Sequence, residues 1–353
     1  MADGNPVGLE PGDFQALCLQ QAAIERGVPH VFGRLPKRPG REPRLWLRLQ
    51  PGRRCYFYSY GSLRHGDPAQ PEMIGDYLNG DAVPLLFDKN LTKALLRTAG
   101  LSTPLGSVFG PSGLGAALAF FRWLGRPVCL KPNEGRKGEL AFPVVRDEQA
   151  LEAAFTRIIA AGKEVLVEES VPGEVVRFFY VRPRVVAIKH SRCASVVGDG
   201  RRSIAELIAA KNRRRSERRL PGHVPIVLDE DLLAFLAGEG RALGDVQAPG
   251  QRVPLSATSN GATGADSIEC AASTHPSYAA LVEKACAVIA RSGITAADVM
   301  VRDRTAPATP DNYAILELNG SPGVLPYHFP WRGRPQDVSG AILDYLVREA
   351  QAV

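Results

Sequence analysis

The sequence predicts an α/β fold in which helices and short strands alternate along most of the chain. Short apolar runs typical of strands recur along the sequence, and amphipathic segments with capping residues lie between them. Glycine and proline mark the joins between these segments. Such alternation is typical of a mixed α/β architecture. The chain has 353 residues, more than a single core usually holds, so we expect two or three subdomains.

The elements before residue 170 follow from capping residues and apolar periodicity. The first 80 residues are irregular apart from a helix over 13–26 and short strands near 45–49 and 54–60. Asp88 can cap a helix that ends at Gly100, a residue type favoured after a helix. The next predicted elements are a helix over 113–124, strands over 127–132 and 141–145, a helix over 147–161 and a strand over 164–168.

Beyond residue 170, strands over 175–180 and 185–189 are predicted to form a hairpin. Ser203 and Glu206 form a capping box that opens a helix to about residue 215. We expect the basic run 211–219 to be a solvated face near the end of that helix, because it lacks the interleaved aromatic side chains that favour RNA binding. The last predicted elements are a helix over 277–291, two strands and a helix over 338–350.

Composition indicates a globular protein, with 45% hydrophobic and 23% charged residues. No apolar run approaches the roughly 18 residues of a membrane span, and the N-terminus lacks the basic and apolar regions of a secretory signal. We therefore expect a cytoplasmic protein with no membrane partner. The six cysteines show no CxxC spacing, which argues against zinc and against a disulfide framework. A net charge of +6 would favour anionic ligands, although arginine-rich codon usage is the simpler explanation.

Three oxygen-bearing side chains are candidate metal ligands. Glu317 and Asn319 end an apolar run, and they point the same way because side chains alternate along a strand. Asp298 lies in a strand-like run over 294–301 and could face this pair from a neighbouring strand. Carboxylate and amide oxygens suit Mg²⁺, which prefers oxygen donors. For the Glu317–Asn319 pair alone, a surface glutamate and a turn asparagine is an equally good interpretation.

Other residues suggest a phosphate site. Lys89 begins a helix and Lys131 ends a strand, and lysine is scarce in this arginine-rich chain. The loop from Gly135 to Gly138 could lay backbone N–H groups over phosphates. The run 165–169 would then line an adenine ring. No Walker A motif is present.

In these motifs the chain resembles an ATP-grasp ligase over roughly residues 84–347. The stretches over 195–208 and 248–253 are similar to the ATP-grasp module of cyanophycin synthetase, and those over 298–300 and 316–323 to D-alanine–D-alanine ligase. The resemblance implies an ATP-grasp fold with a mostly antiparallel C-terminal sheet. The resemblance to ATP-grasp ligases also rests on the short motifs Asp88-Lys89-Asn90-Leu91-Thr92-Lys93, Ala99-Gly100-Leu101-Ser102-Thr103-Pro104, Leu130-Lys131-Pro132, Val167-Glu168 and Pro172-Gly173.

The resemblance also implies a division into an N-terminal α/β domain over 1–87, a central lid subdomain over 88–170 and a C-terminal domain over 171–353. It implies one or two Mg²⁺ ions, or Mn²⁺, on the three oxygen ligands Asp298, Glu317 and Asn319. Arg177, Lys189 and Arg192 would face the phosphates or the acyl group as catalytic residues. ATP would be bound by Lys89, Lys131, Gly135, Gly138, Glu168 (at the adenine amino group), Glu169, Val171, Glu174, Thr263 and Gly264.

The implied function is an ATP-dependent carboxylate–amine ligase that forms an amide or peptide bond through an acyl phosphate. Its partners would be small-molecule carboxylate and amine substrates of amino-acid or peptide type, with no nucleic acid. A homodimer fits the family. Clustered arginines, including Arg192 and Arg332, hint at an anionic substrate, and surface salt pairs explain them as well.

Departures from the family pattern leave other hypotheses open. The glycine loop is about one residue short, Val175 replaces an acidic ribose contact beside Glu174, and Tyr327 stands where relatives carry histidine. A phosphotransferase that stops after phosphorylation is one alternative, and ADP release with a single substrate would indicate it. A non-catalytic nucleotide-binding protein is another, and the intact set of metal-ligand candidates argues against it.

Overall fold

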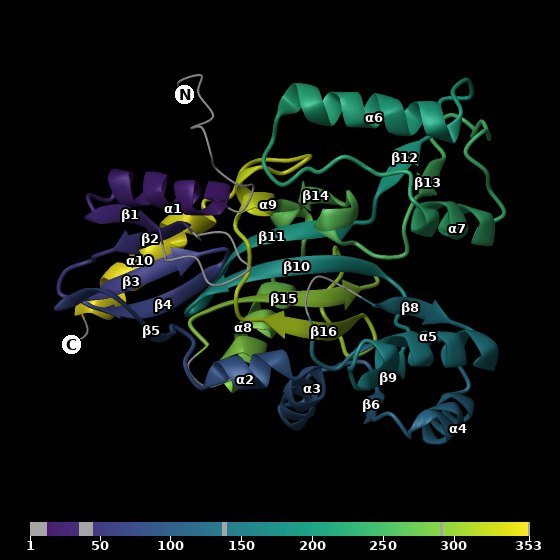
Figure 1. Cartoon of the computed structure of the whole chain (residues 1–353), viewed down its shortest axis with the longest axis horizontal. Helices are drawn as coiled ribbons and strands as arrows, with labels where there is room; N and C mark the ends of the chain where they lie inside the picture. The colour runs from purple at the N-terminus through teal and green to yellow at the C-terminus, as the bar shows by residue number, and fades with distance from the viewer. Residues whose placement is uncertain (1–12, 35–44, 136–139, 290–291, 352–353) are drawn as a thin grey trace.

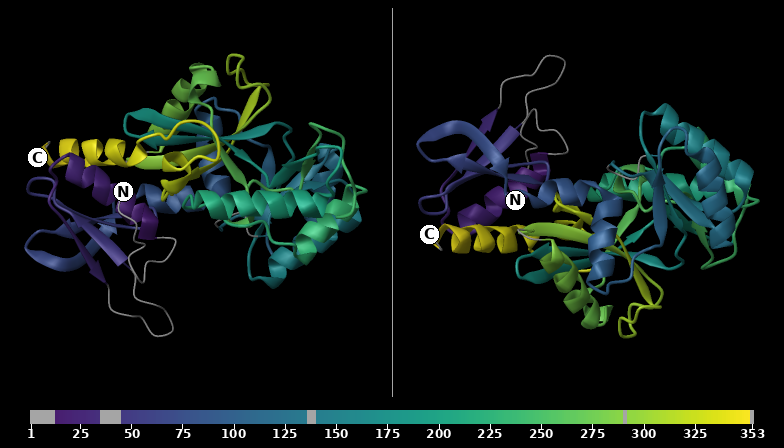
Figure 2. Two further views of the ribbon diagram at one scale, coloured as in Figure 1. Left: turned by 90° about the horizontal axis from the view of Figure 1, so that it is seen from above. Right: turned by 90° about the horizontal axis from the view of Figure 1, so that it is seen from below.

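The computed structural model describes residues 13–34, 45–135, 140–289 and 292–351. Within these residues the chain forms a five-stranded N-terminal sheet, a four-stranded central sheet, a five-stranded C-terminal sheet and a two-stranded sheet (Figure 1). The N-terminal and central sheets lie toward opposite ends of the molecule, with the C-terminal sheet between them (Figure 2). No helix among the described residues is long and apolar enough to cross a membrane.

The N-terminal sheet is an antiparallel meander whose strands follow one another in chain order. Helices α1 (Asp13–Glu25) and α10 (Val338–Gln351) lie side by side against it, so the last helix completes the first core (Figure 2). That core buries Leu19 of α1, Leu47 and Tyr58 of the sheet, and Leu346 of α10. The strands are β1 (His30–Arg34), β2 (Leu45–Leu49), β3 (Cys55–Ser59), β4 (Ser62–Asp67) and β5 (Gln70–Tyr77).

The central sheet is antiparallel, with strand order β6-β9-β7-β8, and two helices cover it. Gly106 lies opposite Glu168, and a Cβ at Gly106 would come within 2.6 Å of the Glu168 side chain, so the close approach of these strands requires glycine. The elements are β6 (Gly106–Phe109), α4 (Leu114–Leu124), β7 (Val128–Pro132), β8 (Phe142–Val145), α5 (Glu148–Ala160) and β9 (Val165–Glu169).

The C-terminal sheet has the order β14-β11-β10-β15-β16, and all neighbours are antiparallel, as predicted. Helices α2 (Ala82–Phe87), α3 (Lys89–Thr98) and α8 (Ser277–Val288) share one core with its apolar side chains. The short helix α9 (Leu325–His328) places Tyr327 against Phe179, whose ring centroid is 5.2 Å away. The strands are β10 (Glu174–Val181), β11 (Arg184–Arg192), β14 (Asp266–Glu269), β15 (Ile294–Val301) and β16 (Tyr313–Asn319).

A smaller layer joins β12 (Ser195–Val197) and β13 (Arg252–Pro254) to α6 (Ile204–Arg218) and α7 (Glu230–Gly238) around a separate core. The capping box at the start of α6 is confirmed. The expectation that the whole basic run 211–219 is solvated is wrong for Lys211 and Arg215. Both turn inward to Asp266, at 2.7 and 2.9 Å, because that buried carboxylate needs compensating charge.

Most predicted elements are present with bounds shifted by one or two residues. Asp88 caps α3 by accepting a hydrogen bond from the backbone N–H of Leu91 at 2.9 Å. The β10–β11 hairpin is confirmed, whereas α8 ends at Val288, earlier than predicted. The elements that the sequence did not predict are the strands β1, β4, β5, β6, β12, β13 and β14 and the helices α2, α7 and α9. Cores also join segments that are distant in sequence, because α3 packs in the C-terminal core and α10 in the N-terminal core.

Candidate active site

A row of charged side chains crosses the C-terminal sheet. Arg177 on β10 lies opposite both Lys189 on β11 and Asp298 on β15. Asp298 in turn lies opposite Glu317 on β16, as the sequence led us to expect. Directly opposed residues on neighbouring strands project from the same face of a sheet. The row therefore presents two cations followed by two carboxylates on one face.

The two carboxylates are held in different electrostatic states. Burial raises the pKa of Asp298 to about 6, and the neighbouring Glu317 carboxylate adds to this shift while Arg177 and Lys189 oppose it. Burial also acts to raise the pKa of Glu317, but the positive charges of Lys131, Lys89 and Arg177 outweigh burial and lower it. Glu317 is therefore the more readily ionised of the pair. Like charges side by side favour a bound cation.

The donor set fits a hard divalent cation. Asp298 Oδ1 is buried without a hydrogen bond, although Arg177 Nε lies 3.4 Å away. Asn319 lies two residues beyond Glu317 on the same strand, and its Oδ1 accepts one hydrogen bond, from Ser321 N at 3.1 Å, which leaves a second lone pair. No cluster of three or more histidine, cysteine or acidic side chains occurs in the described part of the chain, so an amide oxygen has to complete the set. Carboxylate and amide oxygens are ligands for Mg²⁺ or Mn²⁺.

In the cationic half of the row, Lys189 is buried and Arg177 is half-buried. Burial lowers the pKa of Lys189 to about 7, the charge of Arg177 adds to this effect, and Asp298 opposes it. Lys189 Nζ donates to Ser191 Oγ at 2.7 Å and lies 5.9 Å from the centroid of the Tyr327 ring. Tyr327 is fully buried, and its hydroxyl has no hydrogen-bond partner among the described residues.

Lys89 at the start of α3 and Lys131 on β7 of the central sheet are both close enough to Glu317 for their charges to lower its pKa. Lys89 Nζ donates to the carbonyl oxygens of Asn133 and Gly135, both at 3.2 Å, so the start of α3 is tied to the loop after β7. Burial lowers the pKa of Lys89, with Lys131 adding to the shift and Glu317 opposing it. These lysines therefore share one electrostatic environment with Glu317. Gly138, the other predicted residue of this loop, lies outside the described residues.

Glu168 is buried between two lysines. Its Oε1 accepts from Lys131 Nζ at 2.7 Å, and its Oε2 accepts from Lys93 Nζ. A hydrogen bond from adenine to this carboxylate, as the resemblance implied, would have to be accepted by a lone pair left beside these two lysine contacts. The sequence analysis did not identify Lys93 as a site residue. Its position one turn after Lys89 on α3 was the available signal, because residues four apart share a helix face.

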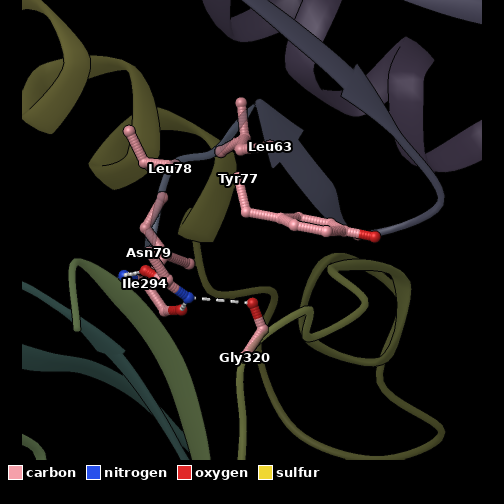
Figure 3. A pocket seen from close by; sticks show the side chains of 7 residues that line it. Leu63, Tyr77, Leu78, Asn79, Ile294 and Gly320 are labelled. Atoms are coloured by element: carbon pink, nitrogen blue, oxygen red, sulfur yellow. Dashed lines mark hydrogen bonds between the residues drawn. The ribbon is translucent and has the colours of Figure 1, made fainter. Parts of the chain in front are cut away.

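Asn79, just after β5, ties the N-terminal region to the strands that carry the acidic residues. Its side-chain nitrogen donates to Ile294 O at 2.8 Å and Gly320 O at 3.0 Å (Figure 3). Its oxygen accepts from the backbone of Gly293 at 2.9 Å and of Ile294 at 3.1 Å. Asn79 thus fixes the start of β15 and the residue that follows Asn319. No recognisable motif marks this region of the sequence, so this contact was not predicted.

The connection between the central and C-terminal sheets carries three further predicted residues. Glu169 Oε1 accepts from Leu105 N at 3.2 Å, and Glu169 Oε2 pairs with Arg126 at 3.1 Å. Val171 lies in the connection between β9 and β10. Glu174 pairs with Arg304 at 2.5 Å, and it projects from the opposite face to Arg177, three residues further along β10.

Thr263, Gly264 and Arg192 lie at the far edge of the sheet. Thr263 Oγ1 donates to Asn260 O at 3.1 Å, and Gly264 O accepts from Arg215 at 2.7 Å. Arg192 ends β11, opposite Asp266 of β14. The β14 edge is separated from β16 by the full width of the sheet. The structure therefore does not bring these three residues to the carboxylate pair.

Comparison with known proteins identifies the class. No family model matches the chain. It is 32% identical over 266 residues to the glutathione biosynthesis bifunctional protein GshAB of Desulfotalea psychrophila, with 73% of this chain and 34% of that protein covered. It is 30% identical over 275 residues to the cyanophycin synthetase of Trichormus variabilis, with 76% and 30% covered. The crystal structure of a bifunctional glutathione synthetase from Pasteurella multocida matches 95% of this chain and 43% of its own, with a TM-score of 0.63 and 25% identity.

The fold and these relatives show that the chain belongs to the ATP-grasp ligases. Within this family it is related to the glutathione biosynthesis bifunctional proteins and the cyanophycin synthetases. The chain spans about a third of the length of these curated relatives, 34% and 30% of the two described above.

Proposed function

We propose that this chain is an ATP-dependent carboxylate–amine ligase that forms an amide or peptide bond on amino-acid or peptide-like substrates through an acyl phosphate. The observation that carries the proposal is the opposed Asp298–Glu317 pair, with a buried Asp298 oxygen that lacks a hydrogen bond. Lys89 and Lys131 lie within electrostatic reach of Glu317. A metal-binding pair beside two lysines suits a bound triphosphate.

The proposed chemistry follows from the weakness of a carboxylate as an acyl donor, because direct amine attack would have to expel oxide. Transfer of the γ-phosphoryl group of ATP to the carboxylate supplies phosphate as a leaving group, and the amine then displaces it. Lys89 and Lys131 would neutralise charge on the phosphoryl oxygens. When bound by Asp298, Glu317 and Asn319, Mg²⁺ would supply Lewis-acid stabilisation of the same oxygens.

The remaining charged residues have supporting roles in this proposal. Arg177 and Lys189 extend the row away from the carboxylates and would contact the acyl group or the transferred phosphoryl group. Glu168 would hold Lys131 in place through their contact at 2.7 Å. The central sheet, which carries Lys131, would close over the site as a lid and exclude water, because an acyl phosphate hydrolyses readily.

A product assay tests the proposal. Amino acids and dipeptides are screened in pairs for ADP and phosphate release with ATP and Mg²⁺, and each candidate is also assayed alone. A ligase releases ADP fully only when a carboxylate and an amine are both present, and mass spectrometry then finds the joined product. Full ADP release with one substrate alone would indicate a phosphotransferase and reject the ligase proposal.

The cytoplasmic location and the homodimer remain predictions. Light scattering of the purified protein measures the oligomeric state directly and so tests the homodimer.

A further inference from the structure

A pocket of about 420 Å³ lies at the β14 edge of the C-terminal sheet, the edge opposite β16. Its volume is in the range of small-molecule sites, roughly 300–1,000 Å³. The lining comes from the end of β11, the β12–β13 pair, α6, β14 and the segment after α9. We call it the arginine pocket, and its charged lining residues are Arg192, Arg202, Lys211, Arg214, Arg252, Arg332 and Asp266.

Positive charge in the arginine pocket exceeds the negative charge available to balance it. Arg202 pairs with Asp199 at 2.7 Å, outside the lining, and Lys211 pairs with Asp266 at 2.7 Å. Asp266 also accepts from Arg215, so this carboxylate is already fully engaged. The other four basic side chains form no ion pair with any residue that the structure describes, and these are Arg192, Arg214, Arg252 and Arg332.

Several of these arginines lie close enough to repel one another. Burial lowers the pKa of Arg192, and the positive charges of Arg252 and Arg332 lower it further, against the opposing effect of nearby carboxylates. Arg252 is held by a hydrogen bond from its guanidinium group to Ser195 Oγ at 3.1 Å. Arginines that repel one another lower the stability of the fold. Their placement around a cavity therefore indicates a binding site for an anion.

The backbone on the remaining wall is fixed. Trp331 N donates to Ser267 O at 2.7 Å, and Glu269 N donates to Arg332 O at 2.9 Å, so the Trp331–Arg332 segment runs along β14. Arg218 lies 4.6 Å from the centroid of the Trp331 ring, which holds the indole from the α6 side. Positioned backbone and a stacked aromatic ring make the cavity pre-organised, which lowers the entropy cost of binding a ligand.

We propose that the arginine pocket binds an acidic, peptide-like ligand through at least two of its carboxylates. Guanidinium groups bind carboxylates in a planar, bidentate geometry, and several of them together select a ligand with several anionic groups. Arg192 follows Lys189 by three residues on β11, so alternation along the strand turns the two side chains to opposite faces of the sheet. The arginine pocket and the charged row therefore lie on opposite faces, and a ligand in the pocket is bound apart from the reacting groups.

Binding measurements without ATP or Mg²⁺ test the pocket directly. The tripeptide Glu-Glu-Glu is titrated into the full chain by calorimetry, with Gln-Gln-Gln as the uncharged match and tripolyphosphate as the phosphate probe. The variant combines R252Q and R332Q, two exposed positions, and R53Q in the N-terminal sheet is the matched control. We expect Glu-Glu-Glu to bind the wild type and R53Q, and to bind the double variant at least tenfold more weakly. Gln-Gln-Gln should bind none of them.

Unchanged Glu-Glu-Glu affinity in the double variant would overturn the proposal. So would a double variant that loses tripolyphosphate binding and keeps Glu-Glu-Glu binding, because the pocket would then be a phosphate site. Thermal melting confirms that the variants fold, and R214Q alone provides a second substitution on a different element, expected to weaken binding by a smaller factor.

The outcome for the pocket can be separated from that for the ligase. Binding of Glu-Glu-Glu that depends on Arg252 and Arg332, without ADP release for any substrate pair, would reject the ligase and support the pocket. Ligase turnover of any substrate pair, with an unchanged affinity of the double variant for Glu-Glu-Glu, would reject the pocket and support the ligase.

Discussion

Charged side chains are balanced differently at the two edges of the C-terminal sheet. At the β16 edge, the carboxylates of Asp298 and Glu317 are buried and lie beside Arg177 and the lysines. At the β14 edge, arginines surround an open cavity, and the one carboxylate in its lining is already paired. A buried charge needs an opposite charge close by, whereas water and dissolved salt screen an excess of exposed charge. The first arrangement suits a cation with phosphates, and the second suits a multiply charged anion.

Glu317→Gln should have the largest effect on the β16 edge. The change removes a charged candidate metal ligand while keeping the side-chain shape, so we expect ATP-dependent turnover to fall by at least about 10²-fold. The fold should persist, since Lys131 retains Glu168 as a partner and Lys89 retains its two carbonyl acceptors. ADP release and thermal melting measure the two effects. Glu152→Gln, an exposed position on α5, is the control, and wild-type turnover in Glu317→Gln would contradict the metal assignment.

Glu168→Gln tests how strongly buried charge depends on its partners. The substitution leaves the buried Lys93 and Lys131 without their shared carboxylate, and breaking a buried pair in this way costs about 3–5 kcal/mol of unfolding free energy. Urea denaturation measures the loss. The control is Glu148→Gln, which removes an exposed pair with Arg122 and should change stability little. Equal losses in the two variants would show that the burial argument is wrong.

Asn79→Ala should destabilise the chain by a smaller amount, about 2–4 kcal/mol, because it removes hydrogen bonds to Gly293, Ile294 and Gly320. The loss should come with weaker Mg²⁺ affinity, since Gly320 follows Asn319. Denaturation and metal titration provide the two readouts, and Gln21→Ala on the surface of α1 serves as the control. Unaltered Mg²⁺ affinity would restrict Asn79 to a structural role.

The smallest expected effect is at the β14 edge. The pKa of Asp199 is lowered to about 2, chiefly by a hydrogen bond from the backbone of Arg202, so this carboxylate stays ionised and paired at working pH. Asp199→Asn would release Arg202 to the arginine pocket and should tighten Glu-Glu-Glu binding by roughly twofold at low salt. Calorimetry at two salt concentrations checks this, and weaker binding would show that the pair orders the pocket.

Strand alternation and helix capping were sufficient to predict part of the site. The period-two pattern placed Glu317 and Asn319 on one face, and the antiparallel register then brought Asp298 opposite Glu317. The cap at Asp88 located the start of α3 and therefore Lys89. These are local signals, or pairings between two strongly patterned strands, which a single sequence contains.

The rest depended on contacts that no local pattern contains. Lys211 was expected to be solvated and Lys93 was assigned no role, because only the tertiary fold supplies the buried carboxylates of Glu168 and Asp266 with which they pair. The same holds for the arginine pocket, whose residues come from segments far apart in the sequence. Periodicity indicates which face of an element is polar, but not which distant partner that face meets.

The packing of α10 against α1 bears on how the protein is made. Leu346 lies in the same core as Leu19 and Leu47, so the N-terminal sheet has no complete interior until residues 338–351 have been translated. Its apolar surface stays uncovered while the central and C-terminal sheets are synthesised, a period in which nascent chains are prone to aggregate. Biogenesis of this protein should therefore depend on chaperones more strongly than its size alone suggests.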